Sequence, residues 1–367
     1  MEYTCVQLND LPDEVLMIIL KKLANMEVLY SLVGVHKRLN RIAQDSVFTN
    51  NLTLFISSSN GFVYSLPDPI LDRFFSHILP KIHQKIKWLG LESLSIERIL
   101  RATNYPNLYG ISLYNIQAET AIGLFTDETS SICTLKNQIL ELVLDISTNK
   151  IQSLPEKIPT LKCFSLHCDI ETCVYDELIL PLLHRMLNLE KLSLCLIVGD
   201  RKTFFDGNDL KINIINNMSR LNIFTFNIRS SSRFYNQINL PSNENIQNTF
   251  RADEKGHCHI YSYPYKLNYY DGITNNFPGG IFKYVRKVSL FDEHPFEHEF
   301  FLRIAQSFPL MEKLSVRNEQ RQINKQFRQS KNENQDLSII KYPYLKELDL
   351  IHSCIDYHAQ FLLDMLM

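Results

Sequence analysis

Residues 185–198, RMLNLEKLSLCLIV, contain the pattern that decides the fold of this chain. Leu189, Leu192 and Leu194 follow the spacing L-x-x-L-x-L, and the last three positions alternate as in a short strand with one buried face. The pattern recurs with its first apolar residue at positions 86, 108, 139, 161, 189, 221, 285, 311 and 345. A single strand-and-helix unit cannot bury its own apolar face, so the recurrence predicts units that stack into an array.

The spaces between these strands leave room for helices. The best candidates are DPILDRFFSHIL (68–79), YDELILPLLHRML (175–187) and HEFFLRIAQSF (298–308). The whole pattern resembles the leucine-rich repeat over roughly residues 86 to 355, which implies an irregular solenoid of short parallel strands plus helices. The longest gap, from 221 to 285, is 64 residues, so we expect it to contain one degenerate unit with CHIYSY (258–263) as its strand.

Two polar stretches interrupt the array. Residues 229–256 lack strand or helix periodicity, and residues 317–337 are rich in Gln, Asn and charged side chains. They are either solvated insertions or binding loops carried by a rigid scaffold.

The N-terminal stretch LNDLPDEVLMIILKKL (8–23) predicts a short helix with a continuous apolar face. Pro12 suits the first helical position. Acidic residues at 13 and 14 in the first turn and lysines at 21 and 22 in the last turn complement the helix dipole. The apolar positions of this helix are Val15, Leu16, Ile19, Leu20 and Leu23.

A second helix capped by Asn25 and a third over residues 35–45 complete a three-helix unit. Three helices of this size cannot bury all of their apolar side chains, and exposed apolar patches usually mark interaction sites.

These first residues closely resemble an F-box over residues 8 to about 48. The match includes Leu11-Pro12, Glu14-Val15, Ile19-Leu20 and the Val35-x-Lys37-Arg38 entry to the third helix. The family usually has Cys at the position of His36 and Trp at that of Leu39, so the chain departs from it at both places. The residues that the resemblance implies as adaptor-binding are Leu11, Pro12, Glu14, Val15, Ile19, Leu20, Leu23, Leu32, Val35, Lys37, Arg38 and Leu39.

Together the two resemblances predict an α/β chain with a three-helix F-box at residues 1–50, a connecting helical segment at 51–85 and a leucine-rich-repeat-like substrate-binding domain at 86–367. They imply a substrate-recognition subunit of an SCF-type cullin–RING ubiquitin ligase. The F-box is expected to bind a Skp-type adaptor, and through it a cullin, while the repeats bind a protein substrate. The alternative is an interaction scaffold outside the ligase, with a diverged F-box.

Composition argues against other classes of partner. The net charge is −2, from 38 basic and 40 acidic residues, and gives no electrostatic case for nucleic acid. The apolar run at 15–20 is far shorter than the roughly 20 residues that span a bilayer, and it follows acidic residues, so we expect neither a membrane segment nor a signal peptide. The eight cysteines are scattered, which favours reduced thiols in the cytoplasm or nucleus.

A metal-dependent hydrolase is the rival from another class. The segment HPFEH (294–298) matches the H-x-x-E-H pattern, but Pro295 stands where a continuous helix is required. Cys163, Cys168 and Cys173 are spaced more widely than the usual zinc pairs and suit core packing better. The sequence therefore predicts a non-catalytic chain without a metal or other cofactor.

Overall fold

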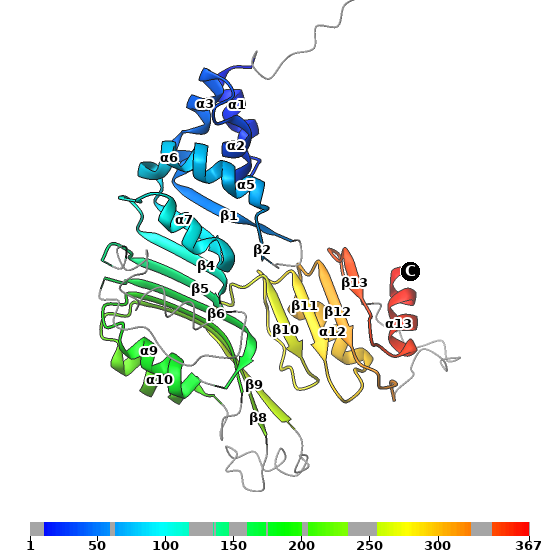
Figure 1. The fold of residues 1–367 in the computed structure, drawn as a ribbon. Coiled ribbons are helices and arrows are strands. Elements are labelled where there is room, and N and C mark those ends of the chain that lie inside the picture. Colours follow the sequence, from blue (N-terminus) through cyan, green and yellow to red (C-terminus); the bar gives the residue numbers. More distant parts are fainter. Residues whose placement is uncertain are drawn as a thin grey trace, which may run out of the picture. The chain divides into compact units, whose positions relative to one another are not determined.

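The computed structural model describes residues 11–58, 63–116, 135, 137–146, 160–173, 175–199, 205–233, 255–323 and 340–366 (Figure 1). It is a mixed α/β structure that begins with short helices and continues mainly as sheet. The chain falls into two units, Met1–Tyr261 and Ser262–Met367, and each is described by itself.

The first unit begins with α1 (Asp13–Leu20), α2 (Asn25–Leu32), α3 (Lys37–Ala43) and α4 (Ser46–Thr49). Two details differ from the predicted helices. Pro12 occupies the capping position ahead of α1, and the lysines at 21 and 22 follow its last residue instead of lying in its last turn. Asn25 does not cap α2; its Nδ2 donates to the carbonyl oxygens of Val47 and Asn51, and so joins the helix to the strand that follows.

A sheet follows with the strand order β2-β1-β3-β4-β5-β6-β7-β8-β9. Its strands are β1 (Asn51–Ser57), β2 (Val63–Ser65), β3 (Trp88–Glu92), β4 (Gly110–Ile116), β5 (Glu141–Ile146), β6 (Cys163–Thr172), β7 (Lys191–Val198), β8 (Ile223–Arg233) and β9 (Lys255–Tyr261). Neighbouring strands in the series from β1 and β3 to β8 are parallel, and β2 and β9 pair antiparallel at the two edges. The segment 51–85, predicted to be helical, therefore begins with two strands.

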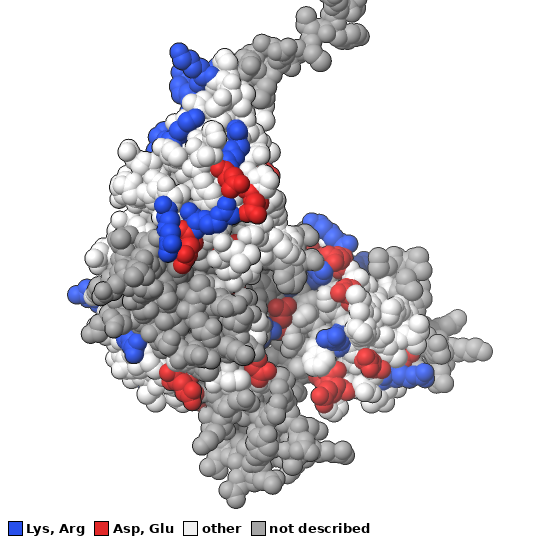
Figure 2. Space-filling model, viewed as in Figure 1, with Lys and Arg blue, Asp and Glu red and all other residues white. Residues whose placement is uncertain are grey.

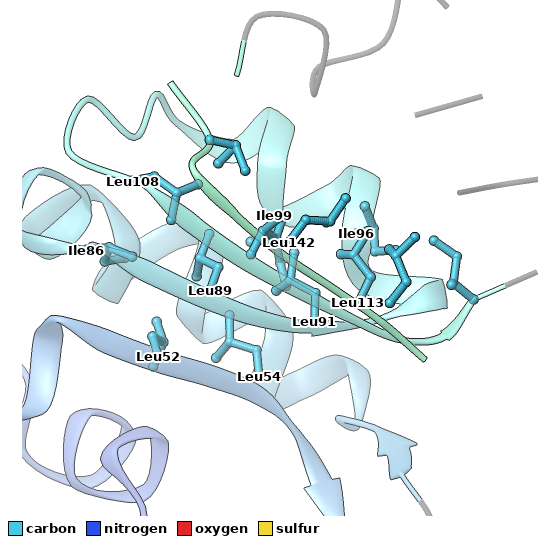
Figure 3. Close-up of a cluster of buried hydrophobic side chains, with 14 of the residues drawn as sticks. Leu52, Leu54, Ile86, Leu89, Leu91, Ile96, Ile99, Leu108, Leu113 and Leu142 are labelled. Atoms are coloured by element: carbon cyan, nitrogen blue, oxygen red, sulfur yellow. The ribbon is translucent and has the colours of Figure 1, made fainter. Parts of the chain in front are cut away.

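The recurring apolar positions lie side by side in this sheet. Leu52 pairs with Leu89 and Leu54 with Leu91, so β1 continues the pattern one strand earlier than the sequence indicates. The aligned side chains from β1, β3, β4 and β5 are buried together with residues of α7 (Ile96–Ala102), as Figure 3 shows. Alternate residues of these strands face the opposite side of the sheet, because side chains alternate along a strand.

A repeated main-chain contact fixes the register of the parallel strands. The N–H groups of Glu190 and Lys191 both donate to the carbonyl oxygen of Lys162, at 2.7 and 3.0 Å. The same paired contact recurs from strand to strand, and the accepting carbonyls belong to Asn50, Lys87, Tyr109, Leu140, Lys162, Glu190, Asn268, Arg286 and Glu312. The main chain alone makes this contact, and side-chain ion pairs such as Lys162–Glu190 and Lys346–Glu312 join some of the same positions.

Helical segments connect the strands. Residues 68–85 form α5 (Asp68–Arg73), the π-helix η2 (Phe74–Ile78), α6 (Leu79–Ile82) and the 3₁₀ turn η3 (His83–Lys85). The predicted helix at 175–187 is the π-helix η5 (Tyr175–Ile179) followed by α9 (Leu180–His184), and α10 (Gly207–Asn213) comes before β8. Both π-helices end at an Ile-Leu-Pro sequence, and proline has no N–H for the usual α-helical bond, which favours a widened turn there.

The second unit is a four-stranded parallel sheet with its own apolar core. It consists of β10 (Tyr269–Ile273), β11 (Lys287–Phe291), β12 (Lys313–Arg317) and β13 (Glu347–Asp349), with α12 (His298–Ser307) and α13 (Ile355–Leu366). Val288, Leu290 and Leu314 from the repeat pattern are buried, as is Phe301 of α12.

The two interrupted regions differ from the prediction. Residues 229–233 continue β8, and the strand expected at 258–263 is β9, which ends at Tyr261 and runs antiparallel to β8. It therefore does not belong to the parallel series, because parallel pairing resumes only with β10 and β11. Residues 234–254 and 324–339, which include most of both polar stretches, lie outside the described residues. No helix in the described part of the chain has the length and apolar character needed to cross a membrane.

Candidate partner-binding surface of the N-terminal helices

The helix α1 divides its apolar side chains between the core and the surface. Leu16 and Leu20 are buried, whereas Val15, Ile18 and Ile19 are exposed, Ile18 with 64% of its surface. Further exposed apolar residues follow at position 23 and, just before α3, at position 35. An eight-residue helix with apolar residues on both sides presents a surface that the described part of the chain leaves uncovered.

The residues predicted to bind an adaptor separate into a buried and an exposed group. Leu20, Leu32 and Leu39 retain only 4, 8 and 5% exposure, so they act within the core of the helical unit. Leu11 and Arg38 are half-buried, and the exposed members are Pro12, Glu14, Val15, Ile19, Leu23, Val35 and Lys37. The sequence prediction omits Ile18, which adjoins Ile19 and is more exposed; only the three-dimensional position of the helix distinguishes it.

Arg38 joins the start of α1 to α3. Its Nε donates to Asp13 Oδ1 at 2.6 Å, and one of its terminal nitrogens donates to the carbonyl oxygen of Leu11. Arg41 reaches the second carboxylate oxygen, Asp13 Oδ2, at 2.7 Å. The hydrogen bond from Arg38, together with the positive charges of both arginines, lowers the pKa of Asp13 below its usual 3.8. Helices α1 and α3 are therefore held together where the exposed apolar surface begins. Figure 2 shows Lys and Arg side chains gathered at the α3 end of the first unit.

His36 and Leu39 have defined roles at the positions where the chain departs from the expected pattern. The side chain of His36 precedes α3, and its Nδ1 accepts the N–H of Arg38 at 3.3 Å, which caps the helix. Leu39 lies in the core. Neither departure adds a residue to the exposed apolar surface.

Residues 8–51 match the family model of the F-box domain. The chain carries an F-box. No curated protein matches the chain at a significant level.

The F-box packs directly against the first part of the sheet. Arg73 of α5 donates from Nε to the carbonyl oxygen of Tyr30 and from a terminal nitrogen to that of Val33, both at 3.1 Å. Its guanidinium carbon lies 5.1 Å from the centre of the Tyr30 ring. Asn25 adds the two hydrogen bonds from α2 to the carbonyls at positions 47 and 51. These contacts fix the F-box to α5 and to β1, the strand that follows it.

The alternative metal sites do not assemble. The helix α12 begins at His298, so His294 lies before it, and the two histidines share no helical face. Cys168 on β6 is buried, while Cys163 is half-buried and Cys173 is exposed, so the three thiols do not share one environment. Within the described residues, no group of three or more His, Cys, Asp or Glu side chains is placed to hold a metal.

Proposed function

We propose that this chain is the substrate-recognition subunit of an SCF-type cullin–RING ubiquitin ligase. The F-box binds a Skp-type adaptor and, through it, a cullin. The observation that carries this proposal is the exposed apolar surface of the F-box at Val15, Ile18, Ile19, Leu23 and Val35. An apolar patch of this kind is suited to a protein partner that buries it.

The strand series is proposed to be a leucine-rich-repeat solenoid that binds a protein substrate. The parallel order of the strands, the alignment of their apolar positions and the repeated main-chain contact support this assignment. F-box proteins are generally non-catalytic substrate adaptors, and the role proposed here needs no catalytic side chain. Holding a substrate near a conjugating enzyme that carries ubiquitin raises the effective concentration of the substrate at that enzyme, which accelerates the transfer of ubiquitin. Cytoplasm or nucleus is the proposed location.

An interaction scaffold outside the ligase is the second candidate. His36 and Leu39 favour it, because the two departures from the family pattern serve the chain's own cap and core. The family's tryptophan is thus replaced by a residue with less apolar area to offer a partner.

Co-purification with a Skp-type adaptor tests the proposal. Replacing Ile19 with Asp places a charge in the exposed apolar surface without altering the core, and we expect adaptor affinity to fall about 30-fold or more, as for a central interface residue. Ile212→Asp on α10 is the matched control, because Ile212 is also an exposed helical isoleucine but lies outside the F-box. The ligase role is contradicted if the intact chain never retains the adaptor, or if Ile19→Asp retains it as well as Ile212→Asp does.

A further inference from the structure

A cavity of about 490 Å³ lies between the N-terminal end of α2 and the first strand of the sheet. Residues 24–27 form one wall, and Asn51, Thr53, Phe55 and Ser57 of β1 form most of the other. These are the alternate residues of β1 that point away from the core, since the leucines at positions 52 and 54 between them are fully buried. The cavity therefore opens on the side of the sheet opposite the core. Its volume lies in the range of about 300–1,000 Å³ that is usual for ligand pockets.

Small residues form a floor that leads away from the cavity across the sheet. Thr53 pairs with Gly90, and Gly90 pairs with Ser112, so these three lie in one row. Trp88 borders this row on one side. Its ring lies over Gly110, and its Nε1 donates to Ser112 Oγ at 3.0 Å. Gly90 and Ser112 are buried beneath their neighbours, so the surface that a partner meets here is formed by the half-buried side chains of Phe55, Trp88 and Tyr114.

Aromatic rings border the other side of the floor. The rings of Phe55 and Tyr114 meet with their centroids 4.7 Å apart, and Phe55 also lines the cavity. Rings of this kind offer both apolar contact and a negative face to a cation.

The charges around this part of the sheet are acidic. Among the described residues on the same side of β1, β3, β4 and β5, the charged ones are Glu92, Glu141 and Asp145, and none is Lys or Arg. Glu92 is buried and accepts a hydrogen bond from Ser65, and Asp145 lies 3.0 Å from His167 Nδ1. At the cavity itself, Glu27 is exposed, and its Oε2 accepts the N–H of Ala24 at 2.9 Å, which holds the carboxylate at the cavity wall. A carboxylate and an aromatic ring that line the same cavity can together bind a guanidinium or ammonium group.

We propose that this cavity binds an arginine or lysine side chain of an extended protein segment that crosses the side of the sheet opposite the core. The inference rests on the proposed role as a substrate receptor and specifies the class of substrate: a protein with an exposed basic segment. Glu27 binds the cationic group, Phe55 packs against it, and the main chain of the segment lies across the half-buried rings of Trp88 and Tyr114.

The dimensions of the sheet suit a short segment. Neighbouring strands lie about 4.8 Å apart, so the three steps from β1 to β5 span about 14 Å. An extended chain covers about 3.3 Å per residue, which makes roughly four or five residues the length that this part of the face can hold.

Fluorescence anisotropy with the full chain tests this inference. The probes are labelled nonapeptide mixtures with randomised uncharged flanks. They are identical except at the central position, which is arginine, its neutral analogue citrulline, or glutamate. We expect the arginine mixture to bind about 5- to 20-fold more tightly than the citrulline mixture, as one ion pair and one cation–π contact provide, and the glutamate mixture to bind most weakly.

Two substitutions test whether the preference for arginine arises at the cavity. Glu27→Gln retains an oxygen for the N–H of Ala24 and removes the ion pair, so the arginine preference is expected to fall to the roughly 2- to 5-fold that the contact with Phe55 provides. Glu177→Gln, at an exposed acid of η5 outside the cavity, is the matched control and is expected to keep the preference.

The outcomes separate this inference from the proposed function. Equal binding of the arginine and citrulline mixtures, no measurable binding of either, or full arginine preference in Glu27→Gln overturns the inference. Adaptor retention is measured on the same preparations. If the adaptor is retained without an arginine preference, the inference alone fails; if the preference is present in a chain that never retains the adaptor, the ligase role alone fails.

Discussion

At the residue scale, Gly110 shows how one small residue determines the position of a large side chain. A Cβ on this residue would lie 2.0 Å from Trp88 Cε3, well inside van der Waals contact. We expect Gly110→Ala to displace the indole and to lower the free energy of unfolding by about 1–3 kcal/mol, the usual cost of overpacking. Trp88 is the only tryptophan of the chain, so its emission spectrum reports the displacement directly.

The matched control for Gly110→Ala is Gly207→Ala. A Cβ on Gly207 meets no atom within 4 Å, and alanine favours a helix over glycine by up to about 1 kcal/mol. This variant should therefore keep the wild-type emission and be at least as stable as the wild type. An unchanged spectrum in Gly110→Ala would contradict the close packing of the indole on that glycine.

Sequence patterns are least able to predict whether an individual residue is buried or exposed. The repeat pattern correctly identifies Leu192 and Leu314 as core residues, because burial follows from period and spacing. The helical pattern at the N-terminus does not distinguish Leu20, which is buried, from Ile19, which is exposed, because both positions belong to one predicted apolar face. Which side of such a short helix faces the core depends on its neighbours, and no local pattern contains that information.

At the scale of elements, the contact of Asp13 with Arg38 and Arg41 makes the attachment of α1 to α3 dependent on pH. The pKa of Asp13 is lower in the folded chain than its usual 3.8, so its ionised form stabilises the fold. This stabilisation is fully present above pH 3.8 and is lost as the pH falls through the lower, folded-state pKa. Compared with the wild type, Asp13→Asn should unfold at a lower urea concentration near neutral pH, and the difference should disappear in acid. A difference that stays constant as the pH falls would show that the charge of Asp13 does not contribute.

The sequence predicts where the helical segments lie, but not whether they are α-helices or π-helices. The segments 68–79, 175–187 and 298–308 all contain helix, as their apolar spacing indicates. The two π-helices are not predicted, although Pro80 and Pro181 follow them closely. In a sequence, proline normally indicates the start or the end of a helix. It produces a π-helical turn only where it follows a helical turn that has already formed, and the sequence pattern does not show that position.

At the scale of the whole molecule, the two units have separate apolar cores. Leu192 is buried in the first unit and Leu314 in the second. We expect Leu192→Ala to lower the unfolding free energy of the first unit by about 2–5 kcal/mol, and Leu314→Ala to do the same in the second, because each substitution removes buried apolar volume. Hydrogen exchange in denaturant, followed by mass spectrometry on peptides from β7 and β12, measures each unit in the same sample. Equal loss of protection in both units from either variant would contradict separate cores.

The paired main-chain contact at the start of each parallel strand also determines which sequence changes the fold can tolerate. Because two N–H groups and one carbonyl make the contact, it accepts Asn, Lys, Tyr, Leu, Glu or Arg at the carbonyl position without loss. The connection that leads from one strand to the next can be lengthened or shortened while the pairing stays intact. During evolution, a protein of this architecture can therefore gain, lose or duplicate strand-and-helix units and so change its surface. The identity of the residues that link the strands places little constraint on such changes.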